Sequence, residues 1–157
     1  MNKITNKFDQ KKYEKYWQWR SKDNVVIKKR ISNLSEFAKC IKKFNMRYWL
    51  YNRTLLFAYK VNILSPDNYD QVGVWYKEMK DNENFIIELN KIGFFIVKNN
   101  KSEMWLLRNN RITIVKFFSI YNSKTEIDGY KVDINYFIHL NEIDINEIIF
   151  KIPNNTS

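Results

Sequence analysis

The chain of 157 residues is 45% hydrophobic and 17% aromatic, which favours a packed globular domain and excludes intrinsic disorder of the whole chain. Its 27 Lys and Arg residues against 17 Asp and Glu give a formal net charge of +10, which attracts nucleic acid, nucleotides or acidic lipid surfaces. Cys40 is the only cysteine, so an intrachain disulfide and a Cys-rich zinc site are excluded. No apolar run reaches the about 20 residues of a membrane span, and the chain does not begin like a signal peptide, so we expect a cytoplasmic protein with one domain over residues 1–157.

The beginning of the chain carries much of the excess positive charge. We expect a basic helical segment over residues 1–30, with a helix from about Phe8 to Arg20. Aromatic rings among cations suit nucleic-acid binding by stacking and charge attraction, and the candidate residues are Lys11, Lys12, Lys15 and Arg20. The alternative is that the rings pack on the domain and the lysines lie in water.

The core is expected over residues 31–150 and begins with the clearest helix of the sequence, SNLSEFAKCIKKFN. Leu34, Phe37 and Ile41 recur there at helical spacing, and Asn33 with Glu36 has the pattern of an N-terminal cap pair. The next segments indicate a strand (MRYWLY), a short helix (RTLLFAYK), a turn (SPDN) and a second strand (QVGVWY).

The second half of the chain has the pattern of one more helix followed by strands. NENFIIELNKIG predicts a helix that ends at Gly93, and the strands FFIVK, MWLLR, RITIVKFFSIY and YKVDINYF follow it. The paired Asn residues at 99–100 and 109–110 suit the positive φ angles of tight hairpins. The tail NEIDINEIIFKI predicts a short helix with Ile145, Ile148 and Ile149 on its inner face. This order predicts an α+β fold with a mixed or antiparallel sheet and flanking helices.

Four fragments, spread over about residues 34–137, resemble the motifs of one family in the same order. They are WLYNRTLLFAYK, DNYDQVGV, LNKIGFF and KVDINYF. Together they resemble the LicD/fukutin-type branch of the nucleotidyltransferase fold. In that branch W-L-x-x-G-T-L-L-G-A-x-R is followed by D-x-D-I-D-I-G-V, by a helix that ends in Gly-Phe and by V-D-I-F. The resemblance implies a nucleotidyltransferase-like core.

The resemblance also implies a catalytic Mg²⁺ site made by carboxylates of two strands. In the family two carboxylates, one residue apart, project from the same side of a strand, a third comes from a neighbouring strand, and Mg²⁺ bridges the donor phosphates. Tyr69 and Gln71 occupy the first two positions here, and Asp133 matches the third. Asp67 and Asp70 would complete the site, Asp70 through a bulge near Tyr69 that turns its side chain inward.

The resemblance places the phosphates of the donor beside Arg53, Thr54 and Lys60. In the family a Gly before the Thr lets backbone N–H groups approach a phosphate without a side chain in the way. Arg53 occupies that position, and Phe57 occupies the Gly position after TLL. Lys60 retains a cation where the family has Arg.

Three functions are consistent with these residues. The resemblance implies a LicD-like phosphotransferase that moves a phosphorylated alcohol, such as phosphocholine, from a nucleotide-activated donor to a glycan acceptor. The alternative is a catalytically degenerate protein of the same fold that binds a protein partner or an anionic ligand, because Arg53, Phe57 and Tyr69 would fill the cleft. A second alternative is a basic nucleic-acid-binding protein that uses the N-terminal segment.

Overall fold

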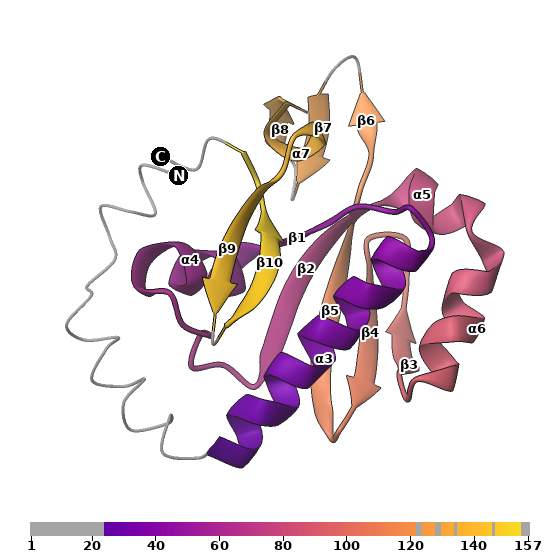
Figure 1. Ribbon diagram of the computed structural model, residues 1–157. Coiled ribbons are helices and arrows are strands. Elements are labelled where there is room, and N and C mark those ends of the chain that lie inside the picture. Colours follow the sequence, from indigo (N-terminus) through magenta and orange to yellow (C-terminus); the bar gives the residue numbers. More distant parts are fainter. Residues whose placement is uncertain (1–23, 122–123, 128–129, 134, 146, 155–157) are drawn as a thin grey trace.

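The structure is a computed structural model that describes residues 24–121, 124–127, 130–133, 135–145 and 147–154 (Figure 1). The helices are α3 (Asn24–Lys43), α4 (Asn52–Val61), α5 (Tyr76–Asp81), α6 (Glu83–Lys91) and α7 (Asn135–Ile138). The strands are β1 (Tyr48–Leu50), β2 (Tyr69–Trp75), β3 (Phe95–Asn99), β4 (Glu103–Arg108), β5 (Arg111–Phe118), β6 (Ile120–Tyr121), β7 (Lys124–Ile127), β8 (Tyr130–Asp133), β9 (Asn141–Ile145) and β10 (Ile148–Ile152). The predicted N-terminal helix and its candidate residues Lys11, Lys12, Lys15 and Arg20 lie outside the described residues.

A five-stranded sheet in the order β1-β2-β5-β4-β3 organises the fold. Its central strands β2 and β5 are parallel, and the remaining neighbours are antiparallel. Figure 1 shows α3 in front of this sheet, with the β9–β10 hairpin beside it, while β6, β7 and β8 form a separate small sheet at one end. This is the α+β class with a mixed sheet and flanking helices that the sequence predicts.

Two clusters of buried side chains lie on opposite faces of the sheet, because successive strand residues point to opposite sides. Tyr48 and Leu50 of β1 join the larger cluster, which contains side chains of α3 and α6, and we name this side the helix face. Trp49, between them, belongs to the second cluster, with Trp75, Phe118 and Phe137, and we name that side the aromatic face. The ring centroids of Trp49 and Phe118 are 4.9 Å apart, as are those of Trp49 and Phe137.

Gly73 makes the packing of the aromatic face possible. It lies opposite Trp49 in the antiparallel pairing of β1 and β2. A Cβ atom at Gly73 would lie 2.2 Å from Nε1 of Trp49, so only glycine leaves room for the indole ring.

Helix α3 is longer at its N-terminus than the sequence pattern predicts. Its described part runs from Asn24, and Ile27, Ile31 and Leu34 continue the buried stripe backwards at helical spacing. Asn33 is therefore not a cap residue, and the predicted cap pair with Glu36 is wrong. The Asn33 side chain is buried inside the helix, where its Nδ2 donates to the carbonyl oxygen of Arg108 at 2.8 Å.

The tail of the chain is a β-hairpin, and the predicted short helix there is wrong. Strands β9 and β10 pair antiparallel, with Ile145 opposite Ile148 and Asn141 opposite Ile152. Ile145, Phe150 and Ile152 are buried in the cluster of the helix face, and Phe150 and Ile152 follow the two-residue period of a strand. A helix and a hairpin would each bury some of the apolar residues of this tail. The contacts of β10 with β1 and α3 favour the hairpin.

Most of the other predicted elements are confirmed, with local differences. The helix NENFIIELNKIG is α6, and Gly93 follows it with a φ of +101°. Asn109 and Asn110 have the expected positive φ angles, but Asn99 and Asn100 do not. Asn100 instead makes its turn through its side chain, whose Oδ1 accepts from the backbone N–H groups of Ser102 and Glu103. Helix α5 was not predicted, and the strand predicted for YKVDINYF is wrong in its second half, because β8 ends at Asp133 and α7 covers Asn135–Ile138.

Within the described residues, none of the helices combines the length and the apolar character that a membrane span requires.

Candidate functional site

Strand β2 decides where the candidate carboxylates point. Its pairing with β5 runs residue by residue from Tyr69 to Trp75, so the strand carries no bulge at Tyr69 along this fully described stretch. Val72 and Val74 lie in the cluster of the helix face. Because strand residues alternate, Asp70 points to the helix face as well, whereas Tyr69 and Gln71 point to the opposite side.

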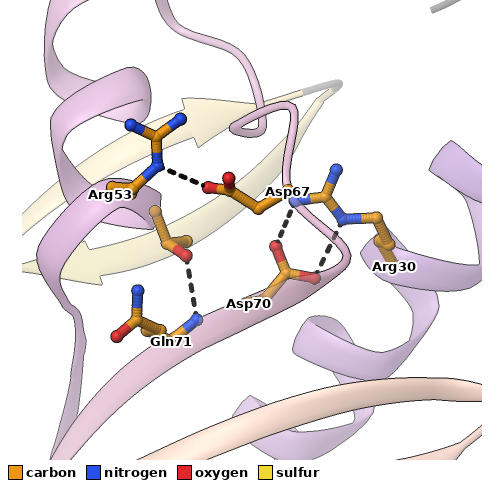
Figure 2. A network of polar contacts seen from close by, with 6 residues as sticks. Arg30, Arg53, Asp67, Asp70 and Gln71 are labelled. Carbon is orange, nitrogen blue, oxygen red and sulfur yellow. Dashed lines mark hydrogen bonds and ion pairs between the residues drawn. The ribbon is translucent and has the colours of Figure 1, made fainter. Parts of the chain in front are cut away.

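On the helix face, Asp70 forms a buried ion pair with Arg30 of α3. Nη2 of Arg30 donates to Oδ1 of Asp70 at 2.6 Å, and its Nε donates to Oδ2 at 3.1 Å (Figure 2). Both side chains are only 2% exposed. A buried carboxylate is stable only when its charge is paired and hydrogen-bonded, and this two-point pair meets both needs. Asp70 therefore attaches α3 to the sheet.

The N-terminal turn of α4 holds two of the three expected phosphate-binding residues. Nε of Arg53 donates to Oδ2 of Asp67 at 2.9 Å, which ties the helix to the loop before β2 (Figure 2). Thr54 is 1% exposed, and its Oγ1 accepts the backbone N–H of Gln71 at 2.8 Å. Arg53 and Thr54 thus both join α4 to the start of β2.

The third of these residues, Lys60, lies at the other end of the same helix. It occupies the last turn of α4, and its Nζ lies 5.1 Å from the ring centroid of Tyr59. Lys60 follows Arg53 by seven residues, which in an α-helix is a separation of about 10 Å along the axis. The structure therefore does not bring Lys60 to the turn that holds Arg53 and Thr54.

Asp133 lies apart from the two aspartates that flank Tyr69. It ends β8, and β8 pairs with β7 in the small sheet, where Asp133 stands opposite Lys124. Its side chain is exposed, and its Oδ1 accepts the backbone N–H of Asn135 at 2.9 Å. The neighbours of β2 are β1 and β5, and the residues of β5 that stand opposite Tyr69 and Gln71 are Ile112 and Ile114.

These positions do not fit the Mg²⁺ site that the family resemblance implies. Mg²⁺ prefers near-octahedral oxygen ligation with one or two carboxylates plus phosphate oxygens. The charge of Asp70 is neutralised by Arg30 and that of Asp67 by Arg53, while Asp133 belongs to another sheet. Among the described residues, no three His, Cys, Asp or Glu side chains are grouped so that they could hold a metal ion.

Arg30 is the residue of this region that the sequence interpretation missed. Arg30 ends the basic segment expected over residues 1–30, whose cations were expected to bind nucleic acid or to lie in water, and its side chain is buried instead. A signal was present, because Arg30 falls between Ile27 and Leu34 on the apolar stripe of the extended helix. A cation on such a stripe requires a buried anion as partner.

Comparison with known proteins gives matches in structure only. A scan against protein-family models gives no match, and a search of curated proteins gives none either. Among solved structures, the crystal structure of ANT(2")-Ia in complex with adenylyl-2"-tobramycin matches with a TM-score of 0.62 at 7% identity, over 79% of this chain and 68% of that chain. The crystal structure of the lincosamide antibiotic adenylyltransferase LnuA, with lincomycin bound, matches with a TM-score of 0.52 at 12% identity, over 76% of this chain and 77% of that chain.

A solution structure of the antibiotic-resistance factor ANT(2'')-Ia also matches, with a TM-score of 0.58 at 7% identity, over 79% of this chain and 66% of that chain. Identities this low show the fold alone. The chain therefore has the nucleotidyltransferase fold, as the sequence predicts. The LicD/fukutin-type branch within that fold stays a prediction.

Proposed function

We propose that this chain is a nucleotidyltransferase-fold protein that works by binding a partner or an anionic ligand and has lost metal-dependent transfer. One observation carries the proposal: the acidic residue of β2, Asp70, points to the helix face, where Arg30 neutralises it. The two positions of β2 on the opposite side, where the family resemblance expects carboxylates, hold Tyr69 and Gln71. Neither side chain supplies a carboxylate, the protein ligand that Mg²⁺ prefers.

Restoring the two carboxylates tests this proposal directly. We expect the double variant Tyr69→Asp/Gln71→Asp to bind Mn²⁺, measured by electron paramagnetic resonance, because the two side chains share one side of the strand. We expect no such binding by the unchanged protein or by the matched, uncharged variant Tyr69→Asn/Gln71→Asn. Mn²⁺ binding by the unchanged protein that is lost in Asp67→Asn or Asp133→Asn would contradict the proposal.

The second candidate is a transferase, which the likeness to adenylyltransferases favours. The family resemblance assigns Asp67, Asp70 and Asp133 as the metal and catalytic residues and Arg53, Thr54 and Lys60 as the phosphate-binding residues. This candidate therefore requires a rearrangement that brings these side chains together, since the structure holds them apart. The resemblance to the LicD-type branch gives a phosphocholine-type donor and a glycan acceptor, and the structural neighbours suggest adenylyl transfer to an antibiotic.

An activity assay separates the two candidates. The protein is incubated with Mg²⁺ and either CDP-choline with a glycan acceptor, or ATP with tobramycin or lincomycin, and the release of CMP or pyrophosphate is measured. The binding proposal expects no release above that of an Asp133→Ala variant. Release that Asp133→Ala abolishes, with an unchanged melting temperature, would establish the transferase.

A further inference from the structure

A groove between α3 and the β9–β10 hairpin lies apart from the residues assigned to either candidate function. Its volume is about 610 Å³, and its walls are the C-terminal half of α3, the start of β1 and the outer part of the hairpin. Tyr48 of β1 lines it, and Tyr48 belongs to the helix face of the sheet. The groove is thus separate from the side of β2 to which Tyr69 and Gln71 point, and we name it the α3–β10 groove.

The α3–β10 groove has an apolar part, which we name its floor. It is lined by side chains from all three walls: Ala38, Ile41, Met46, Leu140, Ile148 and Ile149. Ile149 is 52% exposed although it is a large hydrophobic residue on a strand. An exposed apolar side chain inside a concavity is typical of a ligand site, because a bound apolar group removes it from water.

The charged part of the lining, which we name the rim, is mostly positive. Lys39, Lys42, Arg47 and Lys151 line it, against one acidic residue, Glu142. Lys151 pairs with Glu142 at 2.9 Å, and Lys39 and Arg47 pair with acidic residues outside the lining. No carboxylate in the described part of the chain pairs with the exposed Lys42. The lining therefore has an excess of positive charge, which favours an anionic group at the rim.

Tyr48 joins two of the three walls of the groove, β1 and the hairpin. Its hydroxyl oxygen accepts the backbone N–H of Lys151 at 3.0 Å, which joins β10 to β1. Burial raises the pKa of the Tyr48 hydroxyl to about 12. Tyr48 is therefore neutral at physiological pH and adds no negative charge that would repel an anion.

We infer that the α3–β10 groove binds a single-chain anionic amphiphile, an alkyl chain that ends in a phosphate group. The apolar floor would bury the chain, and the basic rim, Lys42 first, would bind the phosphate. A volume of about 610 Å³ lies within the roughly 300–1,000 Å³ of small-molecule pockets, which favours one chain over a macromolecular surface. The inference would identify the anionic ligand of the proposed function, and it does not depend on the loss of metal-dependent transfer, because the groove shares no residue with the β2 positions discussed above.

Three soluble probes separate the contributions of chain and charge. Isothermal titration calorimetry is performed with octyl phosphate, octyl glucoside and inorganic phosphate, each below its aggregation concentration. We expect binding of octyl phosphate, and at least about tenfold weaker binding of the other two, because each lacks one of the two recognised groups. Equal binding of octyl glucoside would overturn the charge requirement, equal binding of inorganic phosphate would overturn the apolar one, and no binding of any probe would overturn the inference.

Exposed residues provide variants that leave folding unchanged. We expect Ile149→Asp and Lys42→Glu each to weaken octyl phosphate binding at least about threefold, since one charges the floor and the other reverses the rim charge. The matched controls are Ile87→Asp, because Ile87 is 53% exposed on α6, and Lys28→Glu, because Lys28 is exposed on α3 away from the groove. Controls that weaken binding as much as the groove variants would show adsorption to the general basic surface and overturn the inference.

Discussion

The two faces of β2 use neighbouring residues in different ways. On the helix face, Asp70 precedes Val72 and Val74, and its charge is neutralised by Arg30 at the edge of an apolar core. On the other face, Gln71 precedes Gly73 and Trp75, and aromatic rings fill the space beyond it. A shift of one residue along a strand moves a side chain to the opposite face, so an acidic residue beside the positions where the family resemblance expects carboxylates pairs with Arg30 instead.

The largest expected effect comes from breaking the ion pair of the helix face. Asp70→Ala leaves the Arg30 guanidinium buried without a partner, and we expect the free energy of unfolding to fall by about 3–5 kcal/mol. Urea denaturation followed by circular dichroism measures it. The double variant Arg30→Met/Asp70→Leu is the control, because two apolar side chains leave no buried charge and should recover most of the loss. A loss below about 1 kcal/mol in Asp70→Ala would show that Asp70 is not structural.

The second effect is a pH dependence of the free energy of unfolding that arises from Cys40, a buried residue of α3. Burial, and to a smaller extent Glu88, raises the pKa of the Cys40 thiol from 9.0 to about 11. The folded state therefore favours the protonated thiol. The contribution of this thiol to the free energy of unfolding is complete below pH 9.0 and is lost as the pH rises to about 11. The loss reaches about 3 kcal/mol at the end of that range. The free energies of unfolding of the protein and of Cys40→Ala, measured by urea titration, should converge as the pH rises from 9.0 to about 11. A constant difference between the two over this range would contradict the prediction.

The third effect tests the aromatic face. We expect Gly73→Ala to lower the free energy of unfolding by about 1–3 kcal/mol, because the new methyl group meets the buried indole of Trp49. Thermal and urea unfolding measure the loss. In a double-mutant cycle, Trp49→Phe should make Gly73→Ala less harmful, since the smaller ring vacates the position of Nε1. Additive losses would show that the contact with Trp49 is not the cause.

The smallest effect concerns the second ion pair, between Arg53 and Asp67. It lies closer to the surface, since Arg53 is 35% exposed and Asp67 is 17% exposed. We expect Asp67→Asn to change the free energy of unfolding by no more than about 1 kcal/mol. A loss as large as that of Asp70→Ala, measured in the same urea experiment, would remove the distinction between the two pairs.

Local periodicity predicted most of the fold. The apolar residues at helical spacing identified the core of α3, and the alternating segments identified β1 and β2. These predictions succeeded because burial on one face imposes a period that is visible in a short window. The tail was misassigned because Ile145, Ile148 and Ile149 of NEIDINEIIFKI fall at helical spacing. In the hairpin Ile149 is 52% exposed and Ile145, Phe150 and Ile152 are buried, and only the contacts with β1 and α3 distinguish the two conformations.

The candidate site was less predictable than the fold. The family resemblance indicated Asp67 and Asp70, but their partners Arg53 and Arg30 are 14 and 40 residues away in the chain. Contacts between residues so distant in sequence have no local pattern. The strand that carries Asp133 was expected beside β2, and the structure places β1 and β5 there instead.

The sequence by itself determined the fold class, the order of most elements and the absence of a carboxylate at Tyr69 and Gln71, because each of these depends on residues close together in the chain. The tertiary structure alone decided that Asp70 pairs with Arg30, that the tail forms a hairpin and that this hairpin closes a groove against α3. The physical reason is that the stability of a buried charge or of an apolar strand depends on the groups that surround it after folding, and these come from distant parts of the chain.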